Sequence, residues 1–338
     1  MLRKILSFGL FSRVMCVVLC LFLVFSSAAS ANIQRLVFAD SQWDSQSILN
    51  EIAKFIVENG FDGYEVGFST ASSTLNMQSM IIGDVDIEIE FWPDNAANFE
   101  DYVAQGDIIS LGVVVTGGVQ GVYVPRYVIE GCPERGIEPM APSLRHVSDI
   151  GRYAHIFADL EDPSVGRFHA PIPAWAFASE IMHNKFRYHG LDSNFNFFRV
   201  GSEAVLFASL LHAYNLGEPW IGYLYAPSWI VGRLDLVMLE AEPFDPELFR
   251  TGATAFPSQN LLTVSSSFFP EKAPDLLDFF GNFSTSADAV SEALAHLEDT
   301  GESHANVAIW FMRKHDNLLD EWLTPEQAKR VREALSRI

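Results

Sequence analysis

Aromatic and acidic residues stand together in one short segment, residues 83–93. Acids alternate there with apolar residues in a strand pattern: Asp84, Asp86, Glu88 and Glu90 against Val85, Ile87, Ile89 and Phe91. The strand pattern ends at Trp92-Pro93, so a flat indole face follows directly on carboxylates. A cation without N–H donors is held by the negative faces of aromatic rings, and nearby negative charge helps to hold it. The segment therefore indicates one wall of a site for such a cation.

A second tryptophan, Trp43, lies just past the first predicted strand, as Trp92 lies just past the third. Because parallel strands end at the same edge of a sheet, we expect the two rings to flank one site. A quaternary ammonium group carries its charge on methyl groups and prefers several ring faces, each contributing ~0.5–2 kcal/mol. Asp44 and Glu90 are expected to add charge at the cation end. The alternative is that each tryptophan belongs to the hydrophobic core.

The second half of the chain offers further candidates for such a site. Tyr123 and Tyr225 lie where the chain is expected to cross between two halves, and Trp175 opens a predicted helix after a Pro-x-Pro loop. An anionic end of the ligand would need donors. The helix start at residues 72–74 offers free amides and Arg126 a guanidinium. The plainer alternatives are an ordinary helix cap and a surface arginine.

The sequence lacks the familiar enzyme motifs. It contains no Gly-x-Ser-x-Gly elbow, no His-Glu-x-x-His pair, no phosphate-binding loop and no Cys-x-x-Cys pair. The histidines are scattered without metal-ligand spacing, so no metal and no cofactor are expected. The alternating acids leave two alternatives open: a secreted hydrolase with paired carboxylates, or acids of which half face solvent. We expect the protein not to be an enzyme.

Alternating strand and helix patterns must position these side chains. Strands are predicted at 35–40, 64–68, 85–91, 108–116, 122–125, 166–171, 196–200 and 220–225, and helices at 48–59, 74–82, 175–186, 202–214, 275–280, 287–297 and 306–314. This order predicts parallel sheets with right-handed crossovers. We expect an α/β protein of two lobes joined by two crossing strands. Lobe 1 comprises residues 32–118 and 228–338, lobe 2 comprises residues 119–227, and the ligand lies between them.

Residues 1–31 read as a secretory signal peptide, with a basic start, an apolar run and a small-x-small cleavage site at 29–31. The formal net charge of the whole chain is −21. Removal of the leader would make it about −24, which excludes nucleic acid as a partner. Cys132 is the one cysteine outside the leader, so no disulfide can form within the mature chain.

Several segments together give the chain a family resemblance: the Trp43 loop, Gly83-Asp84-Val85-Asp86, Glu90-Phe91-Trp92-Pro93, Val122-Tyr123-Val124-Pro125, Pro173-Ala174-Trp175, Tyr188-His189-Gly190-Leu191, Ala213-Tyr214 before Pro219, and Leu224-Tyr225-Ala226-Pro227 before Asp235-Leu236. The chain resembles the substrate-binding proteins of glycine betaine/choline/proline-type ABC importers. It departs from many relatives in two places. Val122 stands where they have tryptophan, and Tyr225-Ala226-Pro227-Ser228 stands where they have Trp-x-Pro-His or a near variant.

The resemblance implies a type II periplasmic-binding-protein fold whose lobes close over a ligand. It also implies delivery to an ABC permease in the inner membrane, which a separate ATPase drives. We expect a monomeric periplasmic receptor that holds a quaternary ammonium compound in an aromatic cage, glycine betaine first and choline next. A receptor for another small cation or an amino acid, such as histidine, proline or carnitine, stays open.

Overall fold

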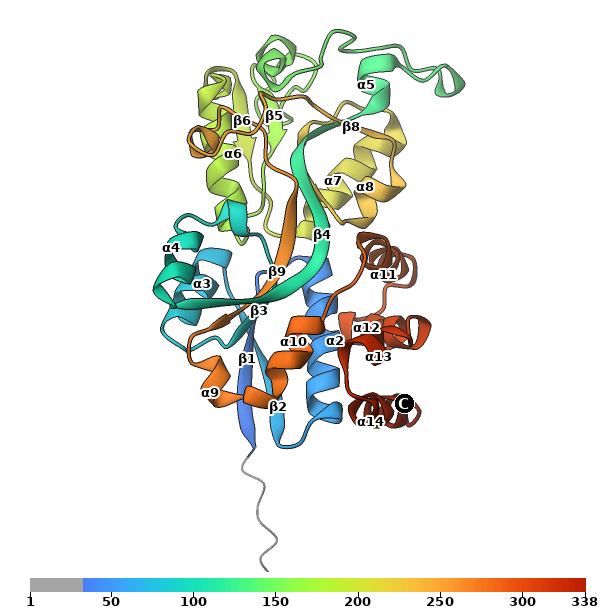
Figure 1. Cartoon of the computed structure of the whole chain (residues 1–338). Coiled ribbons are helices and arrows are strands. Elements are labelled where there is room, and N and C mark those ends of the chain that lie inside the picture. Colours follow the sequence, from blue (N-terminus) through green and yellow to red (C-terminus); the bar gives the residue numbers. More distant parts are fainter. Residues whose placement is uncertain (1–32) are drawn as a thin grey trace, which may run out of the picture. The chain divides into compact units, whose positions relative to one another are not determined.

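The computed structural model describes residues 33–338, and residues 35–338 form one compact unit. The predicted signal peptide, residues 1–31, lies outside the described residues. Figure 1 shows an α/β architecture in which β4 runs from a lower group of strands and helices to an upper one. The two groups are called the lower and upper halves below.

The elements follow the predicted alternation closely. The lower half begins with β1 (Gln34–Asp40), α2 (Asp44–Gly60), β2 (Tyr64–Thr70), α3 (Ser73–Ile81), β3 (Ile87–Phe91) and α4 (Phe99–Gln105), which lead into β4 (Ile108–Pro125). The upper half contains α5 (Arg126–Glu130), β5 (Gly166–His169), α6 (Ala176–Tyr188), β6 (Phe195–Phe198), α7 (Glu203–Leu216), β7 (Gly222–Ala226), α8 (Trp229–Arg233) and β8 (Leu236–Met238). The chain ends with β9 (Gln259–Ser266), α9 (Phe269–Lys272), α10 (Leu277–Asn282), α11 (Ala287–Thr300), α12 (His304–Lys314), α13 (Leu318–Trp322) and α14 (Pro325–Leu335).

The strands are ordered β2-β1-β3-β9-β4-β7-β5-β6, with β8 also paired to β4. The predicted parallel pairing is confirmed for β1 with β3 and for β5 with β6 and β7. Strands β9 and β4 are antiparallel to their neighbours, which the sequence pattern did not predict. The parallel sets in the two halves are thus linked through an antiparallel pair.

Strand β4 is continuous where the sequence analysis predicted two strands separated by Gly117-Gly118. Gly117 has a left-handed φ of 74°, and the pairing with β9 shifts register between Val115 and Gly118. The glycine pair therefore makes a bulge, which bends the strand without ending it. A Cβ on Gly118 would lie 3.1 Å from the Trp92 ring, so this glycine also allows the indole to pack closely.

The point where the chain returns to the lower half lies later than we predicted. Residues 236–238 pair with residues 123–125 of β4, and Glu242 forms a bridge with Thr254, both on the side of the upper half. The chain joins the lower sheet with β9, which pairs with β3. These pairings argue for a return just before residue 259 instead of at residue 228. The lobe bounds themselves stay a proposal.

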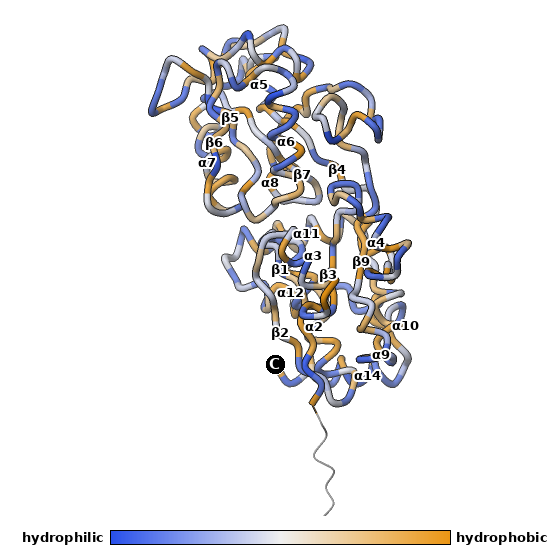
Figure 2. Tube along the Cα trace, turned by 90° about the vertical axis from the view of Figure 1, so that its left-hand side faces the viewer, coloured by the Kyte–Doolittle hydropathy of each residue, from blue (hydrophilic) through white to orange (hydrophobic). Residues whose placement is uncertain are grey.

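Helix α2 forms because apolar residues recur at helical spacing on one face. Ile48, Ile52 and Ile56 are buried on that face, and Asp44 lies in the first turn, where a negative charge is favourable. Figure 2 shows this alternation of hydrophilic and hydrophobic residues along the helices. The core formed by these faces places the first turn of α2 at the edge where β1 and β3 end.

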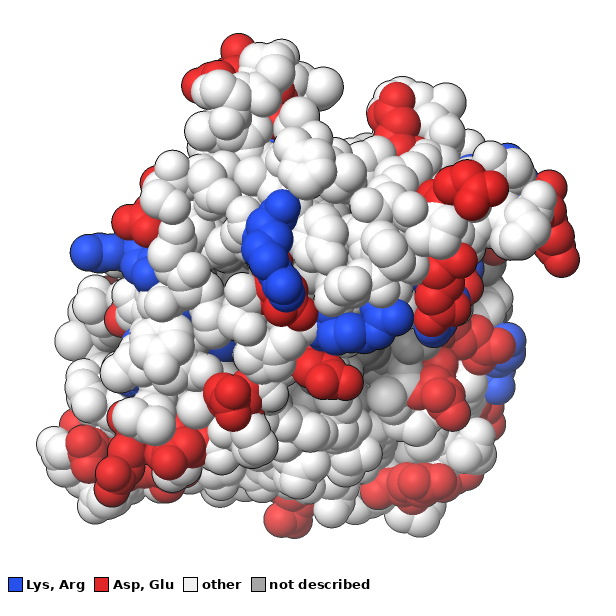
Figure 3. Space-filling view, turned by 90° about the horizontal axis from the view of Figure 1, so that it is seen from above, with Lys and Arg blue, Asp and Glu red and all other residues white. Residues whose placement is uncertain are grey.

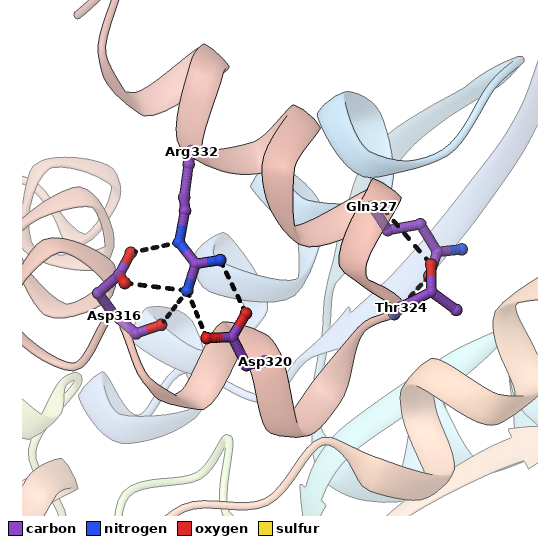
Figure 4. A network of polar contacts seen from close by, with 5 residues as sticks. All are labelled: Asp316, Asp320, Thr324, Gln327 and Arg332. Carbon is purple, nitrogen blue, oxygen red and sulfur yellow. Dashed lines mark hydrogen bonds and ion pairs between the residues drawn. The ribbon is translucent and has the colours of Figure 1, made fainter.

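The C-terminal helices are joined by a polar network on the surface. Arg332 of α14 forms ion pairs with Asp316 and Asp320, and Thr324 and Gln327 form a capping box at the start of α14 (Figure 4). These side chains are largely exposed, so the network contributes little to stability compared with the buried apolar face of the helix. The top face of the molecule carries more acidic than basic side chains, as Figure 3 shows.

Candidate functional site

A cavity lies between the lower and upper halves of the described chain, with about 450 Å³ of empty space that includes its opening to solvent. Aromatic rings form most of its wall. The lining residues are Trp43, Ser73, Glu88, Phe91, Trp92, Asn95, Trp175, Phe177, Ala178, Tyr223 and Tyr225. No lysine, arginine or histidine is among these described lining residues.

The two tryptophans predicted to flank one site both line this cavity. Trp43 is the N-cap residue of α2, directly after β1, and Trp92 follows the last residue of β3. Strands β1 and β3 are parallel, so their carboxyl ends bring the rings to one edge of the sheet. Both side chains are nearly buried. The sequence therefore predicted this half of the cavity from strand order alone.

The upper half supplies the opposite wall. The ring centroids of Trp175 and Tyr225 lie 5.4 Å apart, at an interplanar angle of 83°. Trp92 approaches Tyr225 from the other half, with centroids 6.0 Å apart and an angle of 89°. Tyr223 adds a further ring beside Trp175. Edge-to-face contacts of this kind hold rings in fixed orientations, so the cavity has preformed walls.

Two predicted site residues, and one candidate for the anionic end, lie elsewhere. Tyr123 is buried within β4, paired with Gly222 and Met238, and burial raises the pKa of its hydroxyl to about 12. The carboxylate of Asp44 accepts a hydrogen bond from His304 at 2.9 Å. Arg126 is exposed and paired with acids on the surface. None of the three is among the residues that line the cavity.

The predicted acid Glu90 lies behind the tryptophans. Its carboxyl accepts a hydrogen bond of 2.8 Å from the hydroxyl of Ser45, and the indole groups of Trp92 and Trp43 are close to it. Burial raises the pKa of Glu90 to about 8. This carboxyl is absent from the lining, so its place favours a role in positioning both indoles.

The pattern analysis missed Glu88, the acid that lines the cavity. Strict alternation puts Glu88 and Glu90 on one face, but Glu90 has a left-handed φ of 62° and the register shifts between Glu88 and Phe91. A non-glycine residue in this region is unusual and turns the chain at the end of the strand. Because of this turn, Phe91 and Trp92 both line the cavity although they are neighbours in sequence. The alternative that half of the acids face solvent does not hold, because Asp84 is exposed but Asp86, Glu88 and Glu90 are buried.

Tyr223, Phe177 and Asn95 are also lining residues that the sequence analysis did not single out, whereas Ser73 belongs to the helix start at residues 72–74 that it named. For Tyr223 and Phe177 a signal existed, since both are aromatic residues close to predicted candidates. Ser73 lies in the predicted helix cap at 72–74, and the predicted capping is confirmed, because the side chain of Ser72 accepts a hydrogen bond from an amide of α3. For Asn95 no pattern in the sequence indicated a position in the site.

Hydrogen bonds connect the two halves around the cavity. The amide of Ser73 donates to the carbonyl of Ala174 at 3.0 Å, and the indole N–H of Trp175 donates to the carbonyl of Gln42 at 3.4 Å. Glu203, at the first position of α7, accepts from the Asp44 amide at 2.8 Å and from the Tyr225 hydroxyl. Burial raises the pKa of Glu203 well above its ordinary value. The carboxyl of Glu203 thus joins the first turn of α2 to an aromatic wall of the other half.

The His304–Asp44 contact predicts a pH dependence of stability. The hydrogen bond to Asp44 raises the pKa of His304 in the folded state. Its stabilisation is therefore complete below pH ~6.5 and is lost as the pH rises through the higher folded pKa. We expect the melting-temperature difference between the unmodified protein and His304→Gln to shrink from pH 6 to pH 8. A difference that grows over this range would contradict the assignment.

His169 and His189 also make the stability of the protein depend on pH. Burial lowers the pKa of both to about 4, so they make the protein less stable as the pH falls below ~6.5. Their contribution is the same in both proteins and cancels in the comparison.

The chain was compared with known families and structures. The family model described as the substrate-binding domain of an ABC-type glycine betaine transport system matches residues 34–314. The chain belongs to this family. Its members are solute-binding proteins that bind small ligands and work with an ABC permease. The resemblance predicted from the sequence is thereby confirmed.

Solved structures of low sequence identity share the fold. A glycine betaine/L-proline-binding protein from Borrelia burgdorferi matches with a TM-score of 0.70 and 17% identity, over 88% of this chain and 99% of that one. A choline-binding protein of an ABC transporter, in complex with choline, gives 0.71 and 17%, over 90% and 98%. A lactococcal glycine betaine-binding protein in its closed, liganded form gives 0.65 and 14%, over 86% and 99%. The predicted two-lobed type II periplasmic-binding-protein fold is confirmed.

Two further observations concern the described residues alone. No helix between residues 33 and 338 is long and apolar enough to cross a membrane. In the same part of the chain, His, Cys, Asp and Glu form no group of three or more that could hold a metal ion.

Proposed function

We propose that this protein is the periplasmic receptor of an ABC importer and closes its lobes over a quaternary ammonium compound. The observation that carries the proposal is the set of aromatic rings from both lobes around one cavity: Trp43 and Trp92 from one side, Trp175 and Tyr225 from the other. A methylated cation gains from several ring faces at once, and only the closed arrangement brings these four together. Glycine betaine and choline both carry such a group.

The polar lining supports a quaternary ammonium over a free amino acid. An amino acid such as histidine or proline needs acceptors for its N–H groups and strong donors for its carboxylate. Arginine and lysine are absent from the described lining, so the carboxylate of an amino acid would have no cationic donor there. Glu88 is the one acid of this described lining, and Asp44 is held by His304 outside it. The cavity therefore favours a ligand whose main interactions are with ring faces.

The proposed partner is a permease of the inner membrane with its ATPase, and the proposed state in solution is a monomer without enzymatic activity. The predicted leader would direct export to the periplasm. The high negative charge predicted for the mature chain also keeps it apart from nucleic acid.

Calorimetry with glycine betaine, choline, carnitine and proline tests the proposed ligand class. We expect at least one of the first two to bind with a Kd below ~1 mM, and proline to bind more weakly. A Kd of ~1 mM corresponds to only ~4 kcal/mol, which solvent-exposed contacts alone can supply. If no methylated ammonium compound binds below that value, or if the protein turns a ligand over, the proposed function is wrong.

A further inference from the structure

Glu88 is a buried acid that lines the cavity and has no hydrogen-bond partner among residues 33–338. Its side chain is 1% exposed, and neither carboxyl oxygen accepts a hydrogen bond within that part of the chain, although Ser41 and Gln46 are close to it. A polar group that is buried without a hydrogen-bond partner destabilises the folded protein, and a charged group does so more strongly. At a binding cavity, the best explanation for such an unpaired carboxyl group is that the bound ligand supplies its partner.

The other buried carboxyl groups of residues 33–338 all have partners. Lys272 pairs with Asp86 and Arg167 with Asp159. Ser45 donates to Glu90, and Tyr225 donates to Glu203. The unpaired state of Glu88 is therefore particular to the one acid that lines the cavity.

We propose that Glu88 determines ligand specificity, an inference that rests on the proposed function. Glu88 loses its proton when the cationic ligand binds, and the resulting carboxylate attracts the cation. Glu88 thereby selects ammonium compounds that carry no carboxylate of their own. Choline and tetramethylammonium belong to this class. Glycine betaine does not, because its own carboxylate would lie in the same apolar cavity as an ionised Glu88, where like charges repel strongly. This order is the reverse of the one expected from the sequence.

The proton has a defined origin and destination. In the empty cavity burial raises the pKa of Glu88 to about 8, so the free protein holds it largely protonated at neutral pH. A cation against the ring faces restores the charged form, and the proton passes to the buffer. Choline affinity should therefore rise by up to ~10-fold per pH unit between pH 6 and 8, and then level off.

Titratable groups on the neighbouring elements, only two of which line the cavity, must be told apart from Glu88. They are Asp40 on β1, Asp44 on α2, Glu90 on β3, Glu203 on α7, Tyr223 and Tyr225 on β7, Lys272 on α9, which Asp86 binds, and His304 on α12, which is bonded to Asp44. Glu90 and Glu203 also have raised pKa values. Glu90 accepts a hydrogen bond from Ser45 through one carboxyl oxygen, and Glu203 accepts one from Tyr225, whereas among the described residues Glu88 accepts none through either oxygen.

Titration calorimetry in two buffers of different ionisation enthalpy counts the protons released on binding. The probes are tetramethylammonium, choline and glycine betaine. For the unmodified protein at pH 7 we expect choline to bind tighter than glycine betaine, with release of close to one proton. Glu88→Gln should lower the affinity for choline and tetramethylammonium by ~10- to 100-fold and abolish the proton release. It should also reduce the difference in affinity between choline and glycine betaine.

Two further variants distinguish the role of Glu88 from the roles of the other acids in the same segment. Glu90→Gln should weaken all three ligands alike while proton release persists, because Glu90 positions the indoles. Asp84→Asn, an exposed acid of the same segment, should bind like the unmodified protein. If choline binds but Glu88→Gln leaves its affinity and proton count unchanged, the role of Glu88 is refuted. The same holds if glycine betaine binds tighter than choline without proton release, since a protonated Glu88 would then be donating to its carboxylate. If none of the probes binds the unmodified protein, the proposed function itself fails.

Discussion

Replacement of Trp92 by alanine is expected to raise the Kd for a quaternary ammonium ligand by about 10- to 100-fold, or ~1.4–2.8 kcal/mol. Trp92 lies between the two lobes: it lines the cavity from β3 and contacts Tyr225 of the other lobe. The variant therefore removes a ring face and also opens the wall that holds Tyr225. Calorimetry or the ligand-induced change in tryptophan fluorescence measures the effect.

Conservative and remote variants control this result. Trp92→Phe keeps a smaller ring and should lose less affinity than Trp92→Ala. Trp310, on α12, stacks against His296 with centroids 4.1 Å apart and is absent from the cavity lining. Trp310→Ala should leave the Kd unchanged. Equal losses in the Trp92 and Trp310 variants would mean that the aromatic wall is not the site.

Replacement of Lys272 by methionine is expected to lower the free energy of unfolding by about 2–4 kcal/mol. Its ammonium group lies 2.8 Å from both carboxyl oxygens of Asp86, which is 1% exposed and also accepts from the amide of Val37 at 2.7 Å. The variant leaves a buried carboxylate without its counter-charge, and this loss costs more than the net contribution of the pair. Urea unfolding at pH 7 measures it.

The double variant Lys272→Met with Asp86→Asn should recover part of the loss, because the neutral amide removes the unpaired charge and its oxygen can still accept from Val37. The surface pair Lys329–Glu333, 4.0 Å apart, provides the matched control. Lys329→Met should change the free energy of unfolding by less than ~0.5 kcal/mol. If Lys272→Met is as mild as Lys329→Met, the buried pair does not have the role assigned to it.

The sequence predicted the parts of the fold that depend on local pattern. Apolar residues at helical spacing predicted α2, and strand alternation predicted β1 and β3 and hence the edge where Trp43 and Trp92 meet. Strand β9 and the antiparallel link through β4 were not predictable in this way, since they depend on pairing between residues more than a hundred positions apart. The late return of the chain from the upper half has the same cause.

For the site, residue type and strand order selected four aromatic candidates that all line the cavity, but they could not show which acid lies there. Period-two alternation assigned Glu88 and Glu90 to one face. The left-handed backbone at Glu90 broke that period, so Glu88 reached the cavity while Glu90 turned to Ser45. Tyr123 does not line the cavity. At this position β4 pairs with β7 on one side and β8 on the other, and the side chain is buried there.

The sequence by itself determined most of the elements and the stock of aromatic and acidic residues near the strand ends, because these follow from short-range patterning and composition. The resemblance of several short segments indicated the family. Only the tertiary structure decided which side chains share the cavity. That choice depends on where two distant segments meet and on a single turn of the backbone at Glu90. It left Glu88 buried and unpaired between rings from both lobes, and this arrangement leads to the expected release of a proton on binding.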